Sequence, residues 1–222
     1  MSNVLADESG QSNGMDRKQY DKSLSSRTNE GLTMAANGFC EEIVIAGFGG
    51  QGIMLTGKLL AQTAMKAGKE VTYMPAYGAE VRGGTANCMV VIAEKEIACP
   101  LVSKPDSLIV LNKASLTKFA PRLKNGGLMI LNSSLIDVAP ELDDSIEVVS
   151  IPADNIAVEL GSPKSTNMVA LGAYLQKRGY LTPDAAADAL PDVLAKRYHQ
   201  TLPVNIEALH KGGEYTRNHS HV

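Results

Sequence analysis

The feature that most constrains the fold is a β-branched run, a glycine cluster and a helical repeat, which follow one another directly. They occupy residues 41–70, EEIVIAGFGGQG followed by IMLTGKLLAQTAMKAGKE. Apolar residues recur at helical spacing at Ile53, Leu60, Ala64 and Ala67, which predicts a helix that packs one face on a sheet. The order of strand, tight turn and helix favours an α/β domain.

Strand and helix patterns continue to alternate along the rest of the chain. Gly68 and Gly179 are expected to end helices, and Thr182 with Pro183 to begin one. Pro191 is expected to break or restart that helix. A strand is predicted from Thr85, followed by a polar turn at 94–96 and a short return strand. The other predicted strands are 70–74, 107–112, 127–132 and 146–153, and the predicted helices are 113–123, 154–161, 166–179 and 182–198.

This alternation predicts a three-layer α/β fold with a mainly parallel sheet. The pattern after Thr85 adds an antiparallel hairpin, and the glycine turn after the first strand is Rossmann-like. Residues 1–38 are polar and without periodic apolar spacing, so a disordered N-terminal extension is expected there. Residues 39–212 are interpreted as a single domain, and residues 213–222 as a flexible tail.

Composition excludes several classes of function. The 222 residues carry a net charge of −3 with scattered Lys and Arg, which argues against nucleic acid and anionic membranes as partners. No apolar run has the length of a membrane span, and the first residues lack a signal-peptide pattern, so we expect a cytoplasmic protein. The three cysteines, Cys40, Cys88 and Cys99, match no zinc or iron–sulfur spacing, and no metal site is predicted.

The glycine cluster is the first candidate site. Glycines at this position let the chain turn tightly and let an oxygen-rich ligand approach the backbone, and the start of the following helix favours negative charge. The turn therefore predicts a site for a phosphate, diphosphate or carboxylate, although a tight packing turn without a ligand has the same pattern. The candidate residues are Gly47, Gly49, Gly50, Gln51 and Gly52.

A dinucleotide is disfavoured as the ligand of this turn. A dinucleotide site needs an acidic residue about 20 residues further on, at the end of the second strand. That stretch reads VTYMPAYG, with no acid before Glu80 and no base before Arg82. We therefore expect no appreciable binding of NAD or NADP.

The loop YGAEVRGGTANC, residues 77–88, is the second candidate site. Arg82 offers a planar fork to a carboxylate or phosphate, beside glycines that let the main chain come close. A surface ion pair between Glu80 and Arg82 is the plainer alternative. Asn167 is a further polar candidate, although SPKSTN at 162–167 is equally an ordinary helix start. The candidate residues are Tyr77, Glu80, Arg82, Gly83, Gly84, Asn87 and Asn167.

Three stretches together, GFGGQG, YGAEVRGGTANC and TNMVALGAYL, resemble the gamma subunit of 2-oxoacid:ferredoxin oxidoreductases. The resemblance covers residues 42–202, and the middle stretch is its most specific part. It implies CoA-dependent oxidative decarboxylation of a 2-oxoacid to acyl-CoA, CO2 and reduced ferredoxin. It also implies thiamine diphosphate and iron–sulfur clusters on partner alpha and beta subunits, with a delta subunit in some complexes. The gamma chain is then associated with coenzyme A, and Arg82 with the surrounding glycines would lie near coenzyme A or an adjoining subunit. No catalytic residue is expected in this chain.

The resemblance leaves the 2-oxoacid open. A separate gamma chain without ferredoxin-like cysteine runs favours 2-oxoglutarate, with pyruvate, branched-chain oxoacid and indolepyruvate versions as alternatives. Two other classes of function are also kept: a non-catalytic scaffold subunit, and a stand-alone nucleotide-dependent oxidoreductase, which the missing acid opposes.

Overall fold

The computed structural model describes residues 38–76, 85–137 and 141–219. The described residues from Phe39 onward form one compact unit. Its centre is a six-stranded sheet with the order β2-β3-β1-β4-β5-β6. The predicted N-terminal extension lies outside the described residues apart from Gly38.

All strands of the sheet except β3 point in the same direction. Strands β1, β4, β5 and β6 form parallel pairs, whereas β3 pairs antiparallel with β1 on one side and β2 on the other. The mainly parallel sheet with an antiparallel component is therefore confirmed. The strands are β1 (Cys40–Phe48), β2 (Glu70–Pro75), β3 (Thr85–Ala93), β4 (Ser107–Val110), β5 (Leu128–Asn132) and β6 (Glu147–Ile151).

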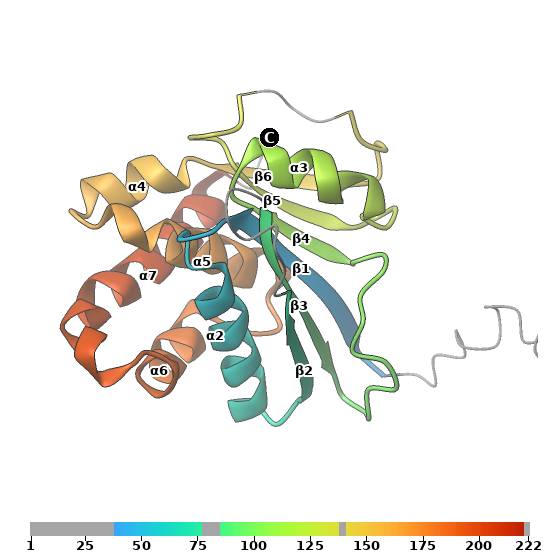
Figure 1. Cartoon of the computed structure of the whole chain (residues 1–222), viewed down its shortest axis with the longest axis horizontal. Coiled ribbons are helices and arrows are strands. Elements are labelled where there is room, and N and C mark those ends of the chain that lie inside the picture. The colour runs from blue at the N-terminus through green and yellow to red at the C-terminus, as the bar shows by residue number, and fades with distance from the viewer. Residues whose placement is uncertain (1–37, 77–84, 138–140, 220–222) are drawn as a thin grey trace, which may run out of the picture. The chain divides into compact units, whose positions relative to one another are not determined.

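Helices cover the two faces of the sheet unequally (Figure 1). The face built on Ile43 and Ile45 is covered by α2, α4, α5, α6 and α7, whereas the face built on Val44 and Ala46 is covered by α3. Because adjacent strand residues point to opposite faces, the continuous apolar run in β1 is buried on both sides. The helices are α2 (Ile53–Lys66), α3 (Lys113–Phe119), α4 (Ala153–Glu159), α5 (Thr166–Arg178), α6 (Pro183–Val193) and α7 (Leu202–His219), with short 3-10 turns η2 (Ala120–Arg122), η3 (Pro163–Ser165) and η4 (Lys196–Thr201).

The local stop and start signals act as predicted. Gly68 and Gly179 both have the positive φ that lets a helix end in a left-handed residue. Thr182 caps α6, because its side chain accepts a hydrogen bond from the backbone N–H of Ala185 at 3.1 Å. Helix α6 nevertheless continues through Pro191 to Val193. The predicted break at Pro191 itself is wrong: the loss of one N–H donor does not end the helix at once, and it stops two residues later at Val193, short of the predicted residue 198.

The predicted return strand after residues 94–96 is absent from the described residues. The segment that follows β3 runs without strand pairing up to β4. Both edges of β3 are already occupied, by β1 and by β2, so a returning strand has no free edge to join. The antiparallel part of the sheet therefore comes from the chain before β3 and not from the chain after it.

Helix α7 contradicts the flexible tail expected from residue 213, because it runs on to His219. It crosses α5 at two buried glycines: a Cβ at Gly212 would collide with the carbonyl oxygen of Val169, and one at Gly172 with that of Leu209. Such close backbone contact needs glycine on both helices. Gly212 and Gly213, at the boundary of the predicted tail, are both buried in this helix.

Candidate functional site

The glycine turn lies at the edge of the sheet where the parallel strands end. The chain leaves β1 towards β2 and β3 on one side, and β4, β5 and β6 follow on the other. The carboxyl ends of β1 and β4 therefore flank a topological switch point, where α/β folds form their ligand crevices. The turn of residues 49–52 follows β1 at this point, and Asn112 follows β4.

Gln51 folds back across the glycine turn and closes it. Its Oε1 accepts hydrogen bonds from the backbone N–H of Phe48 at 2.6 Å and from Nδ2 of Asn112 at 3.3 Å. A Cβ at Gly47 would lie 2.7 Å from this Oε1, so Gly47 leaves the room that Gln51 needs. Asn112 in turn caps α3 by accepting from the N–H of Ser115 at 2.8 Å. The turn is thereby fixed to the start of the neighbouring helix.

Asn167 reaches the same turn from α5, 115 residues further along the chain. Its Nδ2 donates to the carbonyl oxygen of Gly52 at 3.3 Å and to Oγ1 of Thr56 at 3.1 Å. Gly52 has a φ of 74°, and a Cβ there would lie 2.5 Å from this Nδ2. Glycine is therefore required at position 52 both by its backbone conformation and by its side-chain neighbour. The structure brings Asn167 to the glycine turn.

The other side of the turn is open. A Cβ at Gly50, whose φ is 98°, would meet no atom within 4 Å. Helix α2 begins at Ile53 without a side-chain cap, so its first N–H groups are available to a ligand. Lys118 supplies a positive charge close to the turn. Its Nζ lies 3.4 Å from Oγ1 of Thr85, the first residue of β3, and Thr85 pairs with Phe48 at the end of β1. Open backbone donors and a nearby cation suit an anion.

A second polar network continues along this edge and was missed by the sequence analysis. Asn132, at the end of β5, is fully buried and donates from Nδ2 to Asp154 at 2.5 Å. Asp154 also accepts from Oγ1 of Thr166 at 3.0 Å. The signal that was available is that LIVLN and LMILN both end in asparagine. Because parallel strands end at the same edge, Asn112 and Asn132 belong beside the turn.

The remaining predicted residues are not all brought together. Tyr77, Glu80, Arg82, Gly83 and Gly84 lie outside the described residues, so their roles stay predictions.

Asn87 is described, and it lies on the opposite face of the sheet from Asn167. It pairs with Ala46, which faces α3, and it is 8% exposed. The structure therefore does not group Asn87 with Asn167.

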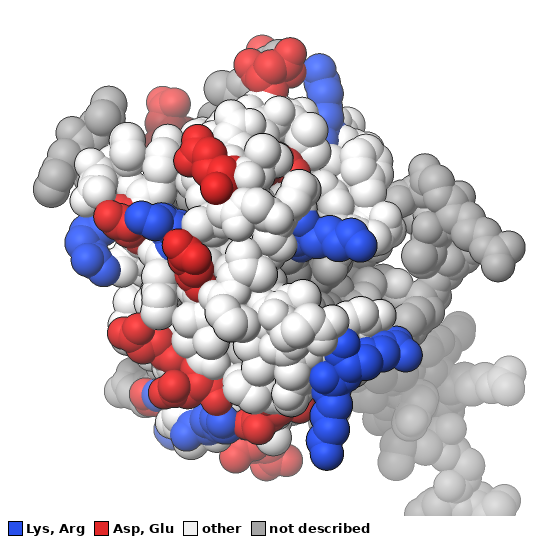
Figure 2. Space-filling model, turned by 90° about the vertical axis from the view of Figure 1, so that its left-hand side faces the viewer, with Lys and Arg blue, Asp and Glu red and all other residues white. Residues whose placement is uncertain are grey.

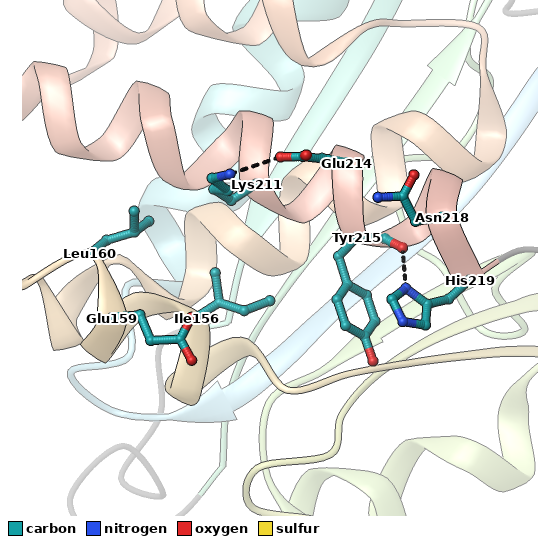
Figure 3. A pocket seen from close by; sticks show the side chains of 8 residues that line it. All are labelled: Ile156, Glu159, Leu160, Lys211, Glu214, Tyr215, Asn218 and His219. Carbon is teal, nitrogen blue, oxygen red and sulfur yellow. Dashed lines mark hydrogen bonds and ion pairs between the residues drawn. The ribbon is translucent and has the colours of Figure 1, made fainter.

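A shallow cavity of about 290 Å³ opens elsewhere, between α4 and α7 (Figure 3). Ile156 and Tyr215 point into it, and the ring of Tyr215 stacks on His219 with 4.0 Å between centroids. It includes none of the predicted site residues. On the helical side of the molecule, acidic and basic side chains are interspersed with wide uncharged areas (Figure 2). The cavity is lined by Ile156, Glu159, Leu160, Lys211, Glu214, Tyr215, Asn218 and His219.

Cysteine chemistry does not contribute to the site. Burial raises the pKa of the Cys88 thiol to about 12, and its Sγ lies 3.4 Å from the carbonyl oxygen of Ile53. A thiol with this pKa is not a nucleophile at neutral pH. Cys40 and Cys99 are exposed and unbridged. Within the described ranges, no three His, Cys, Asp or Glu side chains are grouped to hold a metal ion.

Comparison with known proteins identifies the family. The family model described as "Pyruvate ferredoxin/flavodoxin oxidoreductase" matches residues 42–215, most of the chain. The chain belongs to this oxidoreductase family. The predicted resemblance to the gamma subunit of 2-oxoacid:ferredoxin oxidoreductases is thereby confirmed.

Relatives of this oxidoreductase chain carry several substrate names. The chain is 34% identical to 2-oxoglutarate synthase subunit KorC of Methanocaldococcus jannaschii, over 80% of this chain and 94% of that protein. It is 32% identical to ketoisovalerate oxidoreductase subunit VorA of Methanothermobacter marburgensis, over 79% of this chain. It spans only 36% of the length of that VorA protein. The family is therefore settled by these relatives, and the substrate is not.

Solved structures of this family share the fold. The gamma subunit of keto/oxoacid ferredoxin oxidoreductase from Geobacter sulfurreducens is 27% identical, with a TM-score of 0.69 over 80% of this chain and 99% of that one. The 2-oxoglutarate:ferredoxin oxidoreductase of Magnetococcus marinus, with 2-oxoglutarate, coenzyme A and succinyl-CoA bound, is 28% identical, with a TM-score of 0.72 over 81% of this chain and 31% of that one. In the part of our chain that the structure describes, no helix is both long and apolar enough to span a membrane.

Proposed function

We propose that this chain is the gamma subunit of a multi-subunit 2-oxoglutarate:ferredoxin oxidoreductase. The complex would catalyse CoA-dependent oxidative decarboxylation to acyl-CoA, CO2 and reduced ferredoxin. Thiamine diphosphate and iron–sulfur clusters would be held by alpha and beta partner subunits, with or without a delta subunit. The choice of 2-oxoglutarate is supported by the KorC relative from Methanocaldococcus jannaschii, because 94% of that protein's length matches this chain.

The role proposed for this chain within the complex is to hold coenzyme A. The observation that carries it is the open glycine turn at the switch point of the sheet, where α2 begins without a side-chain cap. Such a turn suits the phosphates of coenzyme A better than a neutral ligand, because its donors are backbone N–H groups at a helix start. The resemblance to a family member whose solved structure has coenzyme A bound supports the same ligand.

The residues present fit part of coenzyme A. Gly49, Gly50 and the first N–H groups of α2 would hold a phosphate, and Gly50 leaves room for it because no atom lies within 4 Å of a Cβ placed there. Arg82 would add its guanidinium fork to the same anion. When bound, coenzyme A supplies the thiol that accepts the acyl group. This chain would orient that carrier, while the chemistry on the oxoacid belongs to the partner subunits.

Coenzyme A kinetics of the assembled complex test this proposal. Gly50→Asp should raise the KM for coenzyme A, because it places a carboxylate beside the phosphate site. No atom lies within 4 Å of the new Cβ, and the strain of a side chain at a φ of 98° is shared by the control variant. Gly50→Asn is the matched control, with nearly the same shape and no charge. A tenfold difference between the two variants is expected, roughly one phosphate contact at about 1.4 kcal/mol. Equal kinetics for both variants would mean that no anion binds at this turn.

Arg82 gives the same experiment a second arm. Arg82→Ala should raise the KM for coenzyme A by about 10- to 150-fold, if a charge-assisted hydrogen bond contributes about 1.5–3 kcal/mol. Decarboxylation of the 2-oxoacid before coenzyme A enters should be nearly unchanged. Arg82→Lys should recover only part, because a point charge cannot replace the fork. A complex that falls apart would favour the scaffold alternative instead.

A further inference from the structure

We propose that Asn167 is a positioning residue, which holds the peptide between Gly52 and Ile53 so that its N–H faces the anionic ligand. This inference rests on the proposed function, because it assigns a role around the ligand of the glycine turn. It changes the role expected from the sequence. The side-chain amide of Asn167 donates to the protein itself, and so acts on the ligand through the backbone.

The carbonyl oxygen of Gly52 is held by three donors. It accepts from the backbone N–H of Thr56 at 2.9 Å, from Oγ1 of Thr56 at 3.0 Å and from Nδ2 of Asn167 at 3.3 Å. Asn167 and Thr56 are 3% and 1% exposed, so little water competes for these bonds. One carbonyl is thus fixed by its own helix and by a helix that is distant in sequence.

Fixing this carbonyl also fixes an N–H group. The carbonyl of Gly52 and the N–H of Ile53 belong to one planar peptide, so when one points into the helix the other points out of its start. Donors on the carbonyl polarise the peptide and strengthen its N–H as a donor. The turn needs this restraint, because Gly50 and Gly52 both have positive φ and glycines allow a peptide to rotate cheaply.

Asn167 is suited to this role because its own position is firmly held. The preceding residue, Thr166, donates to Asp154 at 3.0 Å, and Ser165 donates to Asn205 at 2.9 Å. The start of α5 is therefore tied to α4 on one side and to α7 on the other. A donor mounted on such a support can restrain a glycine turn that has few contacts of its own.

Binding of coenzyme A to the assembled complex is the first test. Asn167→Ala should raise the Kd roughly 5- to 10-fold, the order of one lost hydrogen bond, while kcat of the coenzyme A-independent half-reaction stays within about twofold of wild type. Thr56→Val removes the bridging hydroxyl and should weaken binding in the same direction. Asn205→Ala is the control, because it removes one tie of the α5 start and no contact to the turn, so it should raise the Kd clearly less than Asn167→Ala does.

Hydrogen exchange gives a readout independent of activity. The amide of Thr56 bonds to the restrained carbonyl, so it should exchange faster in Asn167→Ala than in Asn205→Ala. Equal exchange in these two variants would overturn the positioning role.

The outcomes separate this inference from the proposed function. An unchanged Kd in Asn167→Ala, while Gly50→Asp weakens binding, would refute the positioning role and leave the ligand in place. Unchanged binding in both would refute the ligand itself. Equal weakening in Asn167→Ala and Asn205→Ala would show that Asn167 acts through general stability. If Asn167→Ala does not assemble, Thr56→Val decides: weakened binding supports the restraint, and wild-type binding refutes it.

Discussion

The two edges of the sheet use polar residues in opposite ways. At the edge where the parallel strands begin, charged side chains pair with one another. At the edge where they end, the groups around the glycine turn are mostly uncharged amides and backbone N–H groups. At the first edge the charged groups bond to one another within the protein. At the second edge backbone N–H groups stay available as hydrogen-bond donors to a ligand.

The charged edge is built around a buried carboxylate. Glu41, 6% exposed, accepts from Ser107 at 2.6 Å and pairs with Nε of Arg178 at 2.8 Å. Arg178 also donates to the carbonyl oxygen of Asp106 at 2.9 Å. Nearby, Lys124 bridges Glu42 and Asp106 at 2.7 and 2.8 Å. Each of these charges has its partner within the chain.

The comparison teaches where a ligand can be recognised. Saturated ion pairs hold strand starts together and offer nothing to a third group. At the other edge, Gln51, Asn112 and Asn167 shape the turn through uncharged hydrogen bonds, while the start of α2 keeps its donors. An anion can then add its own charge without displacing an internal partner.

Arg178 offers the largest expected effect and tests whether the two edges are independent. Arg178→Met leaves the buried carboxylate of Glu41 without its cation, which should cost about 3 kcal/mol of unfolding free energy. Urea denaturation of the full chain measures this loss. Coenzyme A affinity of the assembled complex should be unchanged. A fall in affinity like that of Asn167→Ala would show that the edges are coupled.

The pH dependence of stability sharpens the account of Glu41. Burial raises the pKa of this carboxyl above 4.5, against the opposing effects of Ser107 and Arg178. A raised folded-state pKa contributes stability that is present below the unfolded pKa and is lost as the pH rises through the folded pKa. Glu41→Gln should therefore gain stability relative to wild type between pH 4.5 and neutrality, in urea denaturation at several pH values. If the stability advantage of Glu41→Gln over wild type grew as the pH was lowered from neutrality to 4.5, the raised pKa would be contradicted.

Lys124 should show the smallest effect. Its side chain is 39% exposed, and ion pairs of this kind contribute about 0–1 kcal/mol. Lys124→Met should lower the unfolding free energy by about 0.5 kcal/mol, and less in high salt. Thermal unfolding at two salt concentrations checks this. A loss as large as that of Arg178→Met would mean that exposure does not distinguish the two cations.

The sequence by itself determined most of the elements and the place of the glycine turn, but it wrongly predicted a return strand after β3 and did not predict helix α7. Helix ends at Gly68 and Gly179 and the cap at Thr182 follow from local backbone preferences, which act within a few residues. The alternation of strands and helices predicted the parallel sheet, because a helix that crosses over between two neighbouring strands leaves them parallel. Motif resemblance added the family, which the comparison confirmed.

Only the tertiary structure decided which residues share a site. Asn167 meets Gly52 across 115 residues because α5 begins beside the end of β1, whereas Asn87 turns to the other face through its pairing with Ala46. Gly212 is a packing residue because α5 lies against it. These outcomes depend on strand order and helix crossing, which bring distant segments together and leave no local trace in the sequence.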